Sequence, residues 1–213
     1  VLGPDKNGII AALLVYPSLF MSIGSLGIRQ STTYFLGKGI FSEDQIKTAI
    51  TQIWLFTAVF SVAVCYLLMH YFSKSGENKW LVALALSPIP FALFNTYNSG
   101  IFLGKNQISV FNKINWIPTL VILVTTTILV LCLSYDISAY LIALLVGPLF
   151  ISFILLFKNK FIHAFSFNYN WNVIKQMLSL GLVYALALLI INLNYKIDVI
   201  LLDNLSTSFE TGI

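Results

Sequence analysis

Four polar side chains interrupt an apolar run near the C-terminal end of the sequence. The run extends from Leu178 to Leu202, and its polar residues are Asn192, Asn194, Lys196 and Asp198. An ionisable side chain at the centre of a membrane helix costs about 2.5–3.5 kcal/mol on insertion scales, so such residues face a cavity or a protein partner rather than lipid. These four residues are therefore candidates for a transport or relay pathway, which makes the chain a candidate transporter.

The spacing of the four residues separates the two charges. Asn192 lies four residues before Lys196, on the same helical face. Asn194 lies four residues before Asp198, so each charged residue has an asparagine on its own helical face. Because Lys196 and Asp198 are two residues apart, they lie on different sides of the helix and each needs its own partner. Alternatively, Lys196 extends to the far interface and Asp198 borders a water-filled vestibule.

A polar and aromatic stripe also occurs in the third apolar run. Its members recur at intervals of three or four residues, which places them on one helical face. They are Ser87, Phe91, Asn95, Asn98 and Phe102. Such a stripe suits a sugar, but Asn95 and Asn98 equally suit hydrogen bonds to a neighbouring helix. Both interpretations of the two asparagines stay open.

Arg29 follows a stretch of small residues, Gly24 to Gly27. Small residues let helices approach closely, and an arginine beside them can anchor a span at the cytoplasmic interface. Alternatively, Arg29 stands at the mouth of a cavity, where its guanidinium could pair with phosphate. Gly100 and Gly104 are four residues apart and predict a second close contact between helices.

The composition indicates that these residues are positioned by membrane helices. Hydrophobic residues make up 58% of the chain and charged residues only 9%, which is more apolar surface than one soluble core of this size needs. Six continuous apolar runs of about 17 to 25 residues can each cross a hydrocarbon core of roughly 30 Å, and their continuity favours helices over barrel strands. Kinks are expected at Pro17 and Pro88. We predict an all-α integral membrane bundle with spans at Ile9–Ile28, Ile50–Phe72, Trp80–Leu103, Ile117–Ser134, Ile137–Phe157 and Leu178–Leu202.

Lys and Arg in the connections predict which helix ends face the cytoplasm. Alternate connections differ, with eight basic residues on one side and three on the other. The first group lies around residues 29–49, 104–116 and 158–177, and we predict that these segments are cytoplasmic. The segment 158–177 is too polar to span and is expected to lie along the membrane surface. Tryptophans are expected near helix ends, where the indole N–H reaches the headgroups. The four are Trp54, Trp80, Trp116 and Trp171.

The sequence carries no motif for covalent chemistry. It has no phosphate-cradling glycine loop, metal-ligating cluster or nucleophile elbow, so we expect neither enzyme activity nor a cofactor. Cys65 and Cys132 are expected to be apolar fillers inside spans, and His70 and His163 to be interfacial. The net charge of +4 is spread over the connections, which indicates anionic lipid headgroups rather than nucleic acid as the counter-charge. Energy for transport would come from an ion gradient or from a partner.

Short motifs along the chain resemble those of the polysaccharide flippases, a family of the multidrug/oligosaccharidyl-lipid/polysaccharide exporter superfamily. Val1–Gly8 is similar to the loop after the first helix of that family. Gly24–Ser31 is similar to the end of its second helix, and Gly100–Asn112 to the exit of its fourth. Lys196–Leu202 and Glu210–Ile213 are similar to the charged pattern of its seventh helix and to the turn that follows. The resemblance covers almost the whole chain.

The resemblance implies a fragment that contains helices two to seven of a two-lobed transporter with roughly 12 to 14 helices. Residues 1–157 would supply five spans of the N-terminal lobe, 158–177 the cytoplasmic connection, and 178–213 the first helix of the C-terminal lobe with the loop after it. The implied function is alternating-access flipping of undecaprenyl-pyrophosphate-linked oligosaccharide repeat units across the bacterial cytoplasmic (inner) membrane for O-antigen or capsular polysaccharide biosynthesis. The implied partners are membrane lipids, the lipid-linked oligosaccharide and the polysaccharide polymerase machinery.

Two rival functions make different demands on the residues. A cation-coupled multidrug exporter of the same superfamily should have an acidic cavity, whereas Arg29 and Lys196 suit the phosphates of an anionic cargo. A membrane-embedded oligosaccharide polymerase should show a long outer loop or an acidic metal motif, and the sequence contains neither. The five predicted spans before residue 158 contain no Asp or Glu, and the sequence is compatible with a proton or sodium as coupling ion. Gly181–Val183 lacks the proline that the family often has near the start of helix seven.

Overall fold

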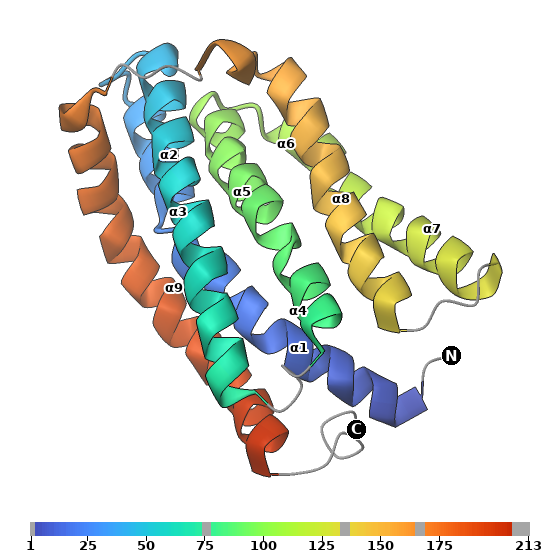
Figure 1. The fold of residues 1–213 in the computed structure, drawn as a ribbon. Coiled ribbons are helices and arrows are strands. Elements are labelled where there is room, and N and C mark those ends of the chain that lie inside the picture. Colours follow the sequence, from blue (N-terminus) through green and yellow to red (C-terminus); the bar gives the residue numbers. More distant parts are fainter. Residues whose placement is uncertain (1–2, 74–77, 133–136, 165–168, 206–213) are drawn as a thin grey trace.

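The computed structural model describes residues 3–73, 78–132, 137–164 and 169–205, which form helices joined by short connections (Figure 1). Six helical segments in this part of the chain are long and apolar enough to span a membrane. The prediction of an all-α membrane bundle is therefore confirmed. The elements are α1 (Gly3–Gly24), α2 (Ile28–Gly37), α3 (Glu43–Phe72), α4 (Lys79–Leu86), α5 (Pro88–Gly104), α6 (Ile108–Asn115), α7 (Ile117–Cys132), α8 (Ile137–Lys158), a 3-10 turn η2 (Phe161–Ala164) and α9 (Trp171–Leu205).

Each predicted apolar run overlaps one membrane-length segment, but five of the six segments begin earlier than predicted, and the fourth and sixth end earlier. The first, third and fourth segments each combine two helices: α1 with α2, α4 with α5, and α6 with α7. Much of 29–49, 104–116 and 158–177, predicted as connections, is therefore helical. The observed segments are Asp5–Gly37, Glu43–Phe72, Lys79–Gly104, Ile108–Val130, Ile137–Lys158 and Trp171–Asn194.

The early start of α3 has a local cause. Ser42 Oγ accepts a hydrogen bond from the Gln45 backbone N–H at 3.3 Å, and Gln45 Oε1 accepts one from the Ser42 N–H at 3.0 Å. This capping box satisfies N–H groups that a helix start leaves open. Glu43 and Asp44 follow in the first turn, where negative charge is favourable. The helix therefore begins at Glu43. The prediction placed its start at Ile50 because the first two turns are mostly polar and do not belong to the apolar run.

Two spans are broken within their length. α1 includes Pro17 and extends to Gly24, and the first span breaks at Ser25–Gly27. The kink expected at Pro17 stays a prediction. Leu26 and Gly27 have positive φ angles of 44° and 61°, so α2 restarts in a new direction. The third span divides at Ser87, directly before Pro88 as predicted. Because Pro88 has no N–H to bond the Leu84 carbonyl, Ser87 Oγ donates to that carbonyl instead, at 2.8 Å.

The helices form a bundle with a diverging hairpin at one side. α2 packs against α5 and α9, and α3 packs against α5 and α9. α7 and α8 form an antiparallel pair that contacts the rest mainly through α5, and this pair spreads away from the bundle in Figure 1. The connections 38–42, 105–107 and 159–160 lie at one shared end, at the top of Figure 1. The three segments with most basic residues therefore gather at the same end of the bundle.

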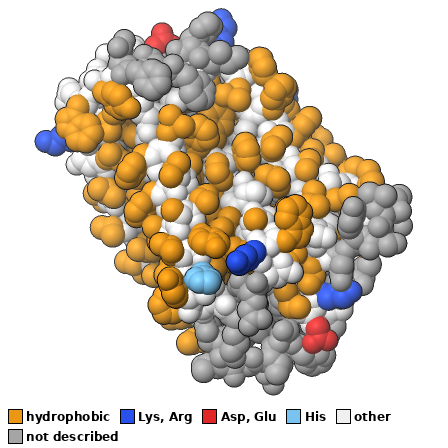
Figure 2. Space-filling model, viewed as in Figure 1, with side chains coloured by type: hydrophobic (Ala, Val, Ile, Leu, Met, Phe, Trp, Pro, Cys, Tyr) orange, Lys and Arg blue, Asp and Glu red, His pale blue; other side chains and the backbone are white. Residues whose placement is uncertain are grey.

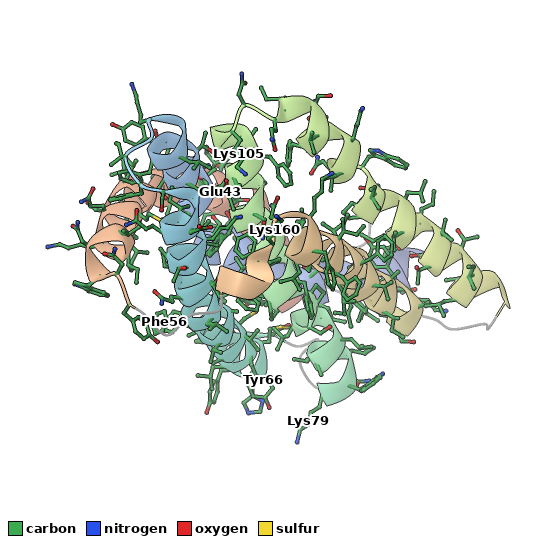
Figure 3. The ribbon with its side chains drawn as sticks, turned by 90° about the horizontal axis from the view of Figure 1, so that it is seen from above. Glu43, Phe56, Tyr66, Lys79, Lys105 and Lys160 are labelled. Carbon is green, nitrogen blue, oxygen red and sulfur yellow. The ribbon has the colours of Figure 1, made fainter. Side chains whose placement is uncertain are left out.

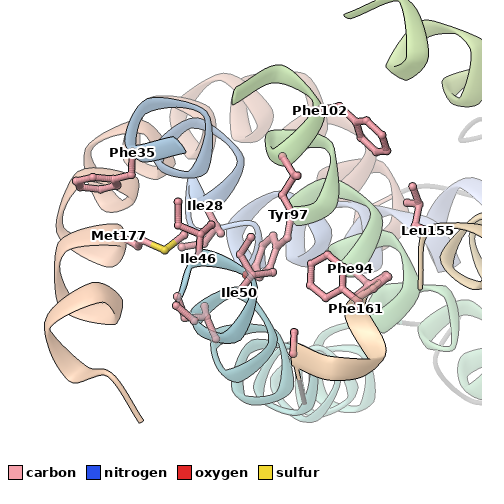
Figure 4. Packing of buried hydrophobic residues seen from close by; sticks show 14 of the residues in the cluster. Ile28, Phe35, Ile46, Ile50, Phe94, Tyr97, Phe102, Leu155, Phe161 and Met177 are labelled. Atoms are coloured by element: carbon pink, nitrogen blue, oxygen red, sulfur yellow. The ribbon is translucent and has the colours of Figure 1, made fainter. Parts of the chain in front are cut away.

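The core has two clusters of buried apolar residues. One cluster surrounds Ile50, Tyr97 and Phe161 near the basic end (Figure 4). Phe161 is fully buried there, although the segment that contains it was predicted to lie along the membrane surface. The second cluster lies toward the opposite end and includes Cys65, a buried free cysteine that acts as an apolar filler, as predicted. The side chains of Cys132 and His163 lie outside the described residues.

The outer face of the bundle is apolar, as a lipid-facing surface requires (Figure 2). Large exposed apolar side chains lie along α3 and α9, among them Phe56, Phe60 and Ile190. Trp80, Trp116 and Trp171 are exposed at helix ends or junctions, as predicted.

Trp54 corrects the prediction for the tryptophans. It lies well inside α3, because α3 begins at Glu43. Its indole Nε1–H donates to the Pro90 carbonyl at 2.7 Å rather than to the headgroup region. Trp54 therefore holds α3 against α5.

Candidate functional site

A cavity of about 160 Å³ lies among α2, α5, α6, α7 and α8. It combines one cationic side chain with amides and hydroxyls on an apolar and aromatic wall, and no carboxylate of the described residues lines it. Its lining residues are Arg29, Asn95, Thr96, Ser99, Phe102, Phe111, Ile114, Asn115, Pro118, Ile151 and Leu155. Two residues singled out from the sequence, Arg29 and Asn95, therefore come together in one site.

Arg29 is the cationic residue of the cavity. It lies in the first turn of α2, which the break at Gly27 allows to start beside α5. The guanidinium carbon lies 5.4 Å from the centre of the Phe111 ring on α6, a cation–π arrangement that fixes the side chain. No carboxylate of the described residues forms an ion pair with Arg29. The partly positive N-terminal end of α2 adds to the attraction of this site for anions.

Asn95 joins the cavity to α8. Its Nδ2–H donates to the Pro148 carbonyl at 3.0 Å, and its Oδ1 accepts from Ser152 Oγ at 2.9 Å. Ser152 is buried and also contacts the Pro148 carbonyl, at 2.8 Å. Asn95 therefore makes the interhelical hydrogen bonds that were one of its two predicted roles, and in addition it lines the cavity.

Asn98 lies one turn further along α5 but does not line the cavity. Its side chain is fully buried. Oδ1 accepts from Asn159 Nδ2 at 2.8 Å, and Nδ2 is 3.4 Å from the Phe94 carbonyl. Asn98 therefore serves the contact between α5 and the end of α8, and the structure does not place it where cargo could reach it.

The described polar side chains at the C-terminal end of α9 are separate from the cavity. Asn192 is half-buried and its Nδ2–H donates to the Leu188 carbonyl of its own helix at 2.8 Å, whereas Asn194 is exposed. Lys196 and Asp198 lie on α9, but their side chains are outside the described residues. α9 packs on α1, α2 and α3, and none of its described side chains lines the cavity. The structure thus does not bring Asn192 or Asn194 together with Arg29.

Sequence reasoning missed an ionic cluster at the basic end. Glu43 binds two lysines, with 2.6 Å to Lys47 Nζ and 2.5 Å to Lys105 Nζ. Lys47 is buried, and the cluster ties the start of α3 to the end of α5 (Figure 3). The Ser42 and Gln45 spacing of a capping box was the signal that could have placed Glu43 at a helix start.

A second missed feature lies at the break of the first span. The buried Tyr97 hydroxyl donates to the Gly24 carbonyl at 2.5 Å, and Thr57 Oγ1 lies 3.1 Å from the same hydroxyl. Three spans thus meet at one tyrosine. Gly24 ends α1, so its carbonyl has no partner within the helix, and Tyr97 provides one.

Glycines bring α5 close to α2, and the break of the first span close to α9. A methyl group on Gly100 would lie 2.6 Å from the Arg29 carbonyl oxygen, and one on Gly104 would lie 2.9 Å from Leu36 Cβ. The predicted close contact through Gly100 and Gly104 is therefore the one between α5 and α2. A methyl group on Gly27 would overlap the Gly181 carbonyl oxygen, so the break of the first span rests directly on α9.

No family model, curated protein or solved structure matches this chain. The chemical character of the cavity is thus the basis for a functional proposal. A guanidinium, amides and hydroxyls can bind an anionic group and neighbouring hydroxyl groups, and among the described residues no group of three or more His, Cys, Asp or Glu could hold a metal ion.

Proposed function

We propose that the chain is part of a flippase that carries undecaprenyl-pyrophosphate-linked oligosaccharide repeat units across the bacterial cytoplasmic membrane by alternating access. The observation that supports this proposal most directly is the cavity around Arg29, which contains a cation, three polar side chains of α5 and no described carboxylate. An anionic cargo with many hydroxyl groups is the class of substrate that matches such a site.

The cargo explains why a cation is needed inside the bundle. A sugar-pyrophosphate headgroup will not cross hydrocarbon unaided, because transfer of its charges from water is very unfavourable. A guanidinium can bind a phosphate through two parallel hydrogen bonds. The cavity of about 160 Å³ is smaller than the roughly 300–1,000 Å³ of drug-sized sites, so it would receive one phosphate or one sugar unit.

The packing of the bundle is compatible with alternating access. Such a cycle requires two packings of similar energy. Interfaces formed by small residues, such as Gly100 against α2 and Gly27 against Gly181, let helices shift with few side chains in the way. Under this proposal the chain supplies most of one lobe of a two-lobed transporter and acts in O-antigen or capsule assembly with the polysaccharide polymerase machinery. The coupling ion would be a proton or sodium.

The experiment uses the full-length protein in cells that lack the chromosomal gene. Loss of the gene should leave lipid-linked repeat units in the cytoplasmic leaflet, where periodate added to intact spheroplasts cannot oxidise them. The wild-type gene should restore their oxidation. Arg29→Ala should not restore it, Arg29→Lys should restore it in part, and the exposed cation Lys38 should be replaceable by Ala without effect.

Two results would contradict the proposal. If Arg29→Ala is present in the membrane at the normal level and fully restores the oxidation of repeat units, the cavity is not part of the transport path. Loss of resistance to cationic drugs with unchanged repeat-unit distribution would instead support the multidrug exporter, the rival function of the same superfamily.

A further inference from the structure

A second and larger cavity lies on the lipid-facing side of the bundle. It is a groove of about 500 Å³ between α3 and the span formed by α4 and α5. Val62 and Ala63 form one wall, and Ala83, Leu86 and Pro90 form the other. Its volume falls within the roughly 300–1,000 Å³ of sites that bind drug-sized molecules. This groove contains none of the residues of the Arg29 cavity.

A hydrogen bond joins two of the helices that border the groove. Trp54 on α3 donates a hydrogen bond to the carbonyl of Pro90, a wall residue, at 2.7 Å. The Ser87 hydroxyl, which also borders the groove, is occupied by its bond to the Leu84 carbonyl. Val62, Ala63, Ala83, Leu86 and Pro90 make the rest of this part of the groove apolar.

Besides Ser87, two polar side chains lie in the lining of the groove. Tyr66 comes from α3 and Lys79 from the first residue of α4, and Figure 3 shows them on neighbouring helices at the same side of the molecule. Lys79 is exposed and has no hydrogen-bond or ionic partner among the described residues. No described carboxylate lines the groove.

The length of the groove matches one leaflet of a membrane. Lys79 and Pro90 are eleven residues apart, which corresponds to roughly 16 Å along a helix at about 1.5 Å per residue. Half of a hydrocarbon core is about 15 Å. Trp80, which follows Lys79, is exposed at the helix end, where aromatic side chains lie at the level of the headgroups. We therefore expect the cationic end of the groove at the membrane interface and the apolar end near the midplane.

We propose that this groove binds one anionic phospholipid of the leaflet at the α4 end of the bundle, with the phosphate at Lys79 and Tyr66 and an acyl chain along the wall from Ala83 to Pro90. Charge complementarity supports an anionic lipid, since the groove offers a cation and a phenol O–H without a described carboxylate. The apolar wall and the one-leaflet length support a lipid rather than a soluble anion. The inference does not depend on what the Arg29 cavity transports.

The test is photo-crosslinking in nanodiscs that contain the full-length protein. The probes are phosphatidylglycerol and phosphatidylcholine that carry the same diazirine acyl chain, and adducts are located by peptide mass spectrometry. We expect adducts in the peptides that contain residues 62–66 and 79–90, with phosphatidylglycerol favoured about fivefold, the effect of one lysine near a headgroup. Lys79→Gln should abolish this preference, whereas Lys175→Gln, an exposed lysine on α9, should preserve it.

A second variant tests the apolar part of the groove. Ala83→Phe should fill the groove and reduce labelling by both lipids while Lys79 is retained. Size-exclusion profiles verify that each variant is folded. If Ala83→Phe does not fold, the Lys79→Gln variant, which changes an exposed residue, still tests the proposal. Equal labelling by the two lipids, or an unchanged preference in Lys79→Gln, would overturn the proposal, because Lys79 would then be a simple interfacial lysine.

Other occupants give distinct results. Displacement of the label by purified lipid-linked oligosaccharide, but not by unlabelled phosphatidylglycerol, would assign the groove to a transported lipid and overturn the proposal. Crosslinks between two copies of the chain at the groove would also overturn the proposal. Because the repeat-unit assay depends on Arg29 and this one on Lys79, either proposal can fail while the other stands.

Discussion

Gly27 and Gly181 meet backbone against backbone, at the point where the first span breaks and α9 passes it. Gly27 has a φ angle of 61°, a conformation that glycine adopts without steric cost. A side chain on either residue would enter space held by the backbone of the other segment. The pair therefore sets how closely the two halves of the first span approach α9.

The first prediction concerns this contact. Gly181→Ala should lower the thermal stability of the detergent-solubilised protein, by about 1–3 kcal/mol as for other overpacked sites, although alanine is otherwise the better helix residue. Gly37→Ala is the control, because a methyl group there would lie 3.6 Å from its nearest neighbour, an ordinary contact. Equal or higher stability of Gly181→Ala would show that α9 can move away without loss.

The second prediction concerns Tyr97. Tyr97→Phe removes the hydroxyl that donates to the Gly24 carbonyl and leaves that carbonyl without its partner in the core. The expected loss is about 1–3 kcal/mol of stability, the cost of a buried group without a hydrogen bond. Tyr34→Phe, at an exposed position, should be neutral. Thermal unfolding followed by circular dichroism measures both variants, and a neutral Tyr97→Phe would mean that water or Thr57 can replace the hydroxyl.

The third prediction concerns Phe111, whose ring lies beside the Arg29 guanidinium. Phe111→Leu keeps the site apolar but removes the cation–π contact, so transport should fall by about two- to fivefold, which corresponds to about 0.5–1 kcal/mol. The protein level in the membrane should stay normal. Phe56→Leu, on the lipid-facing side of α3, is the control. Unchanged transport would indicate that Arg29 is positioned by the backbone alone.

The fourth prediction concerns the ionic cluster. Glu43→Gln should destabilise the bundle, because it leaves the buried Lys47 without its carboxylate, a loss of about 1–3 kcal/mol. Asp44→Asn, at an exposed neighbouring position, should have little effect. Adding Lys47→Gln to Glu43→Gln should recover part of the loss, because no unpaired charge then remains buried. If the double variant recovers no stability, the loss in Glu43→Gln comes mainly from the broken ion pair with Lys105.

The helical class and the approximate positions of the spans could be predicted because long apolar runs have few alternatives in a membrane. The helix starts were less predictable. Hydropathy registers only apolar residues, whereas α3 begins with a polar capping box at Ser42 and Gln45. α9 likewise begins at Trp171, inside a stretch that is polar by composition.

The candidate site could be predicted only in part, for a different reason. Arg29 was identified from its position after a small-residue stretch, but Phe111, which fixes it, comes from a segment predicted to be a loop. Asn95 and Asn98 look equivalent in the sequence, yet one lines the cavity and the other is buried against Asn159. Which side of a helix meets a neighbour depends on tertiary packing, and spacing along one helix does not determine it.

Trp54 gives the molecule an optical reporter. Of the four tryptophans in this sequence, Trp80, Trp116 and Trp171 are exposed, whereas the indole of Trp54 is bound to the Pro90 carbonyl between α3 and α5. Its emission should therefore lie at shorter wavelength and be less accessible to aqueous quenchers than that of the other three. Any movement that separates α3 from α5 must break this hydrogen bond. A red shift of the Trp54 emission would therefore report the opening of the bundle in real time, without an attached label.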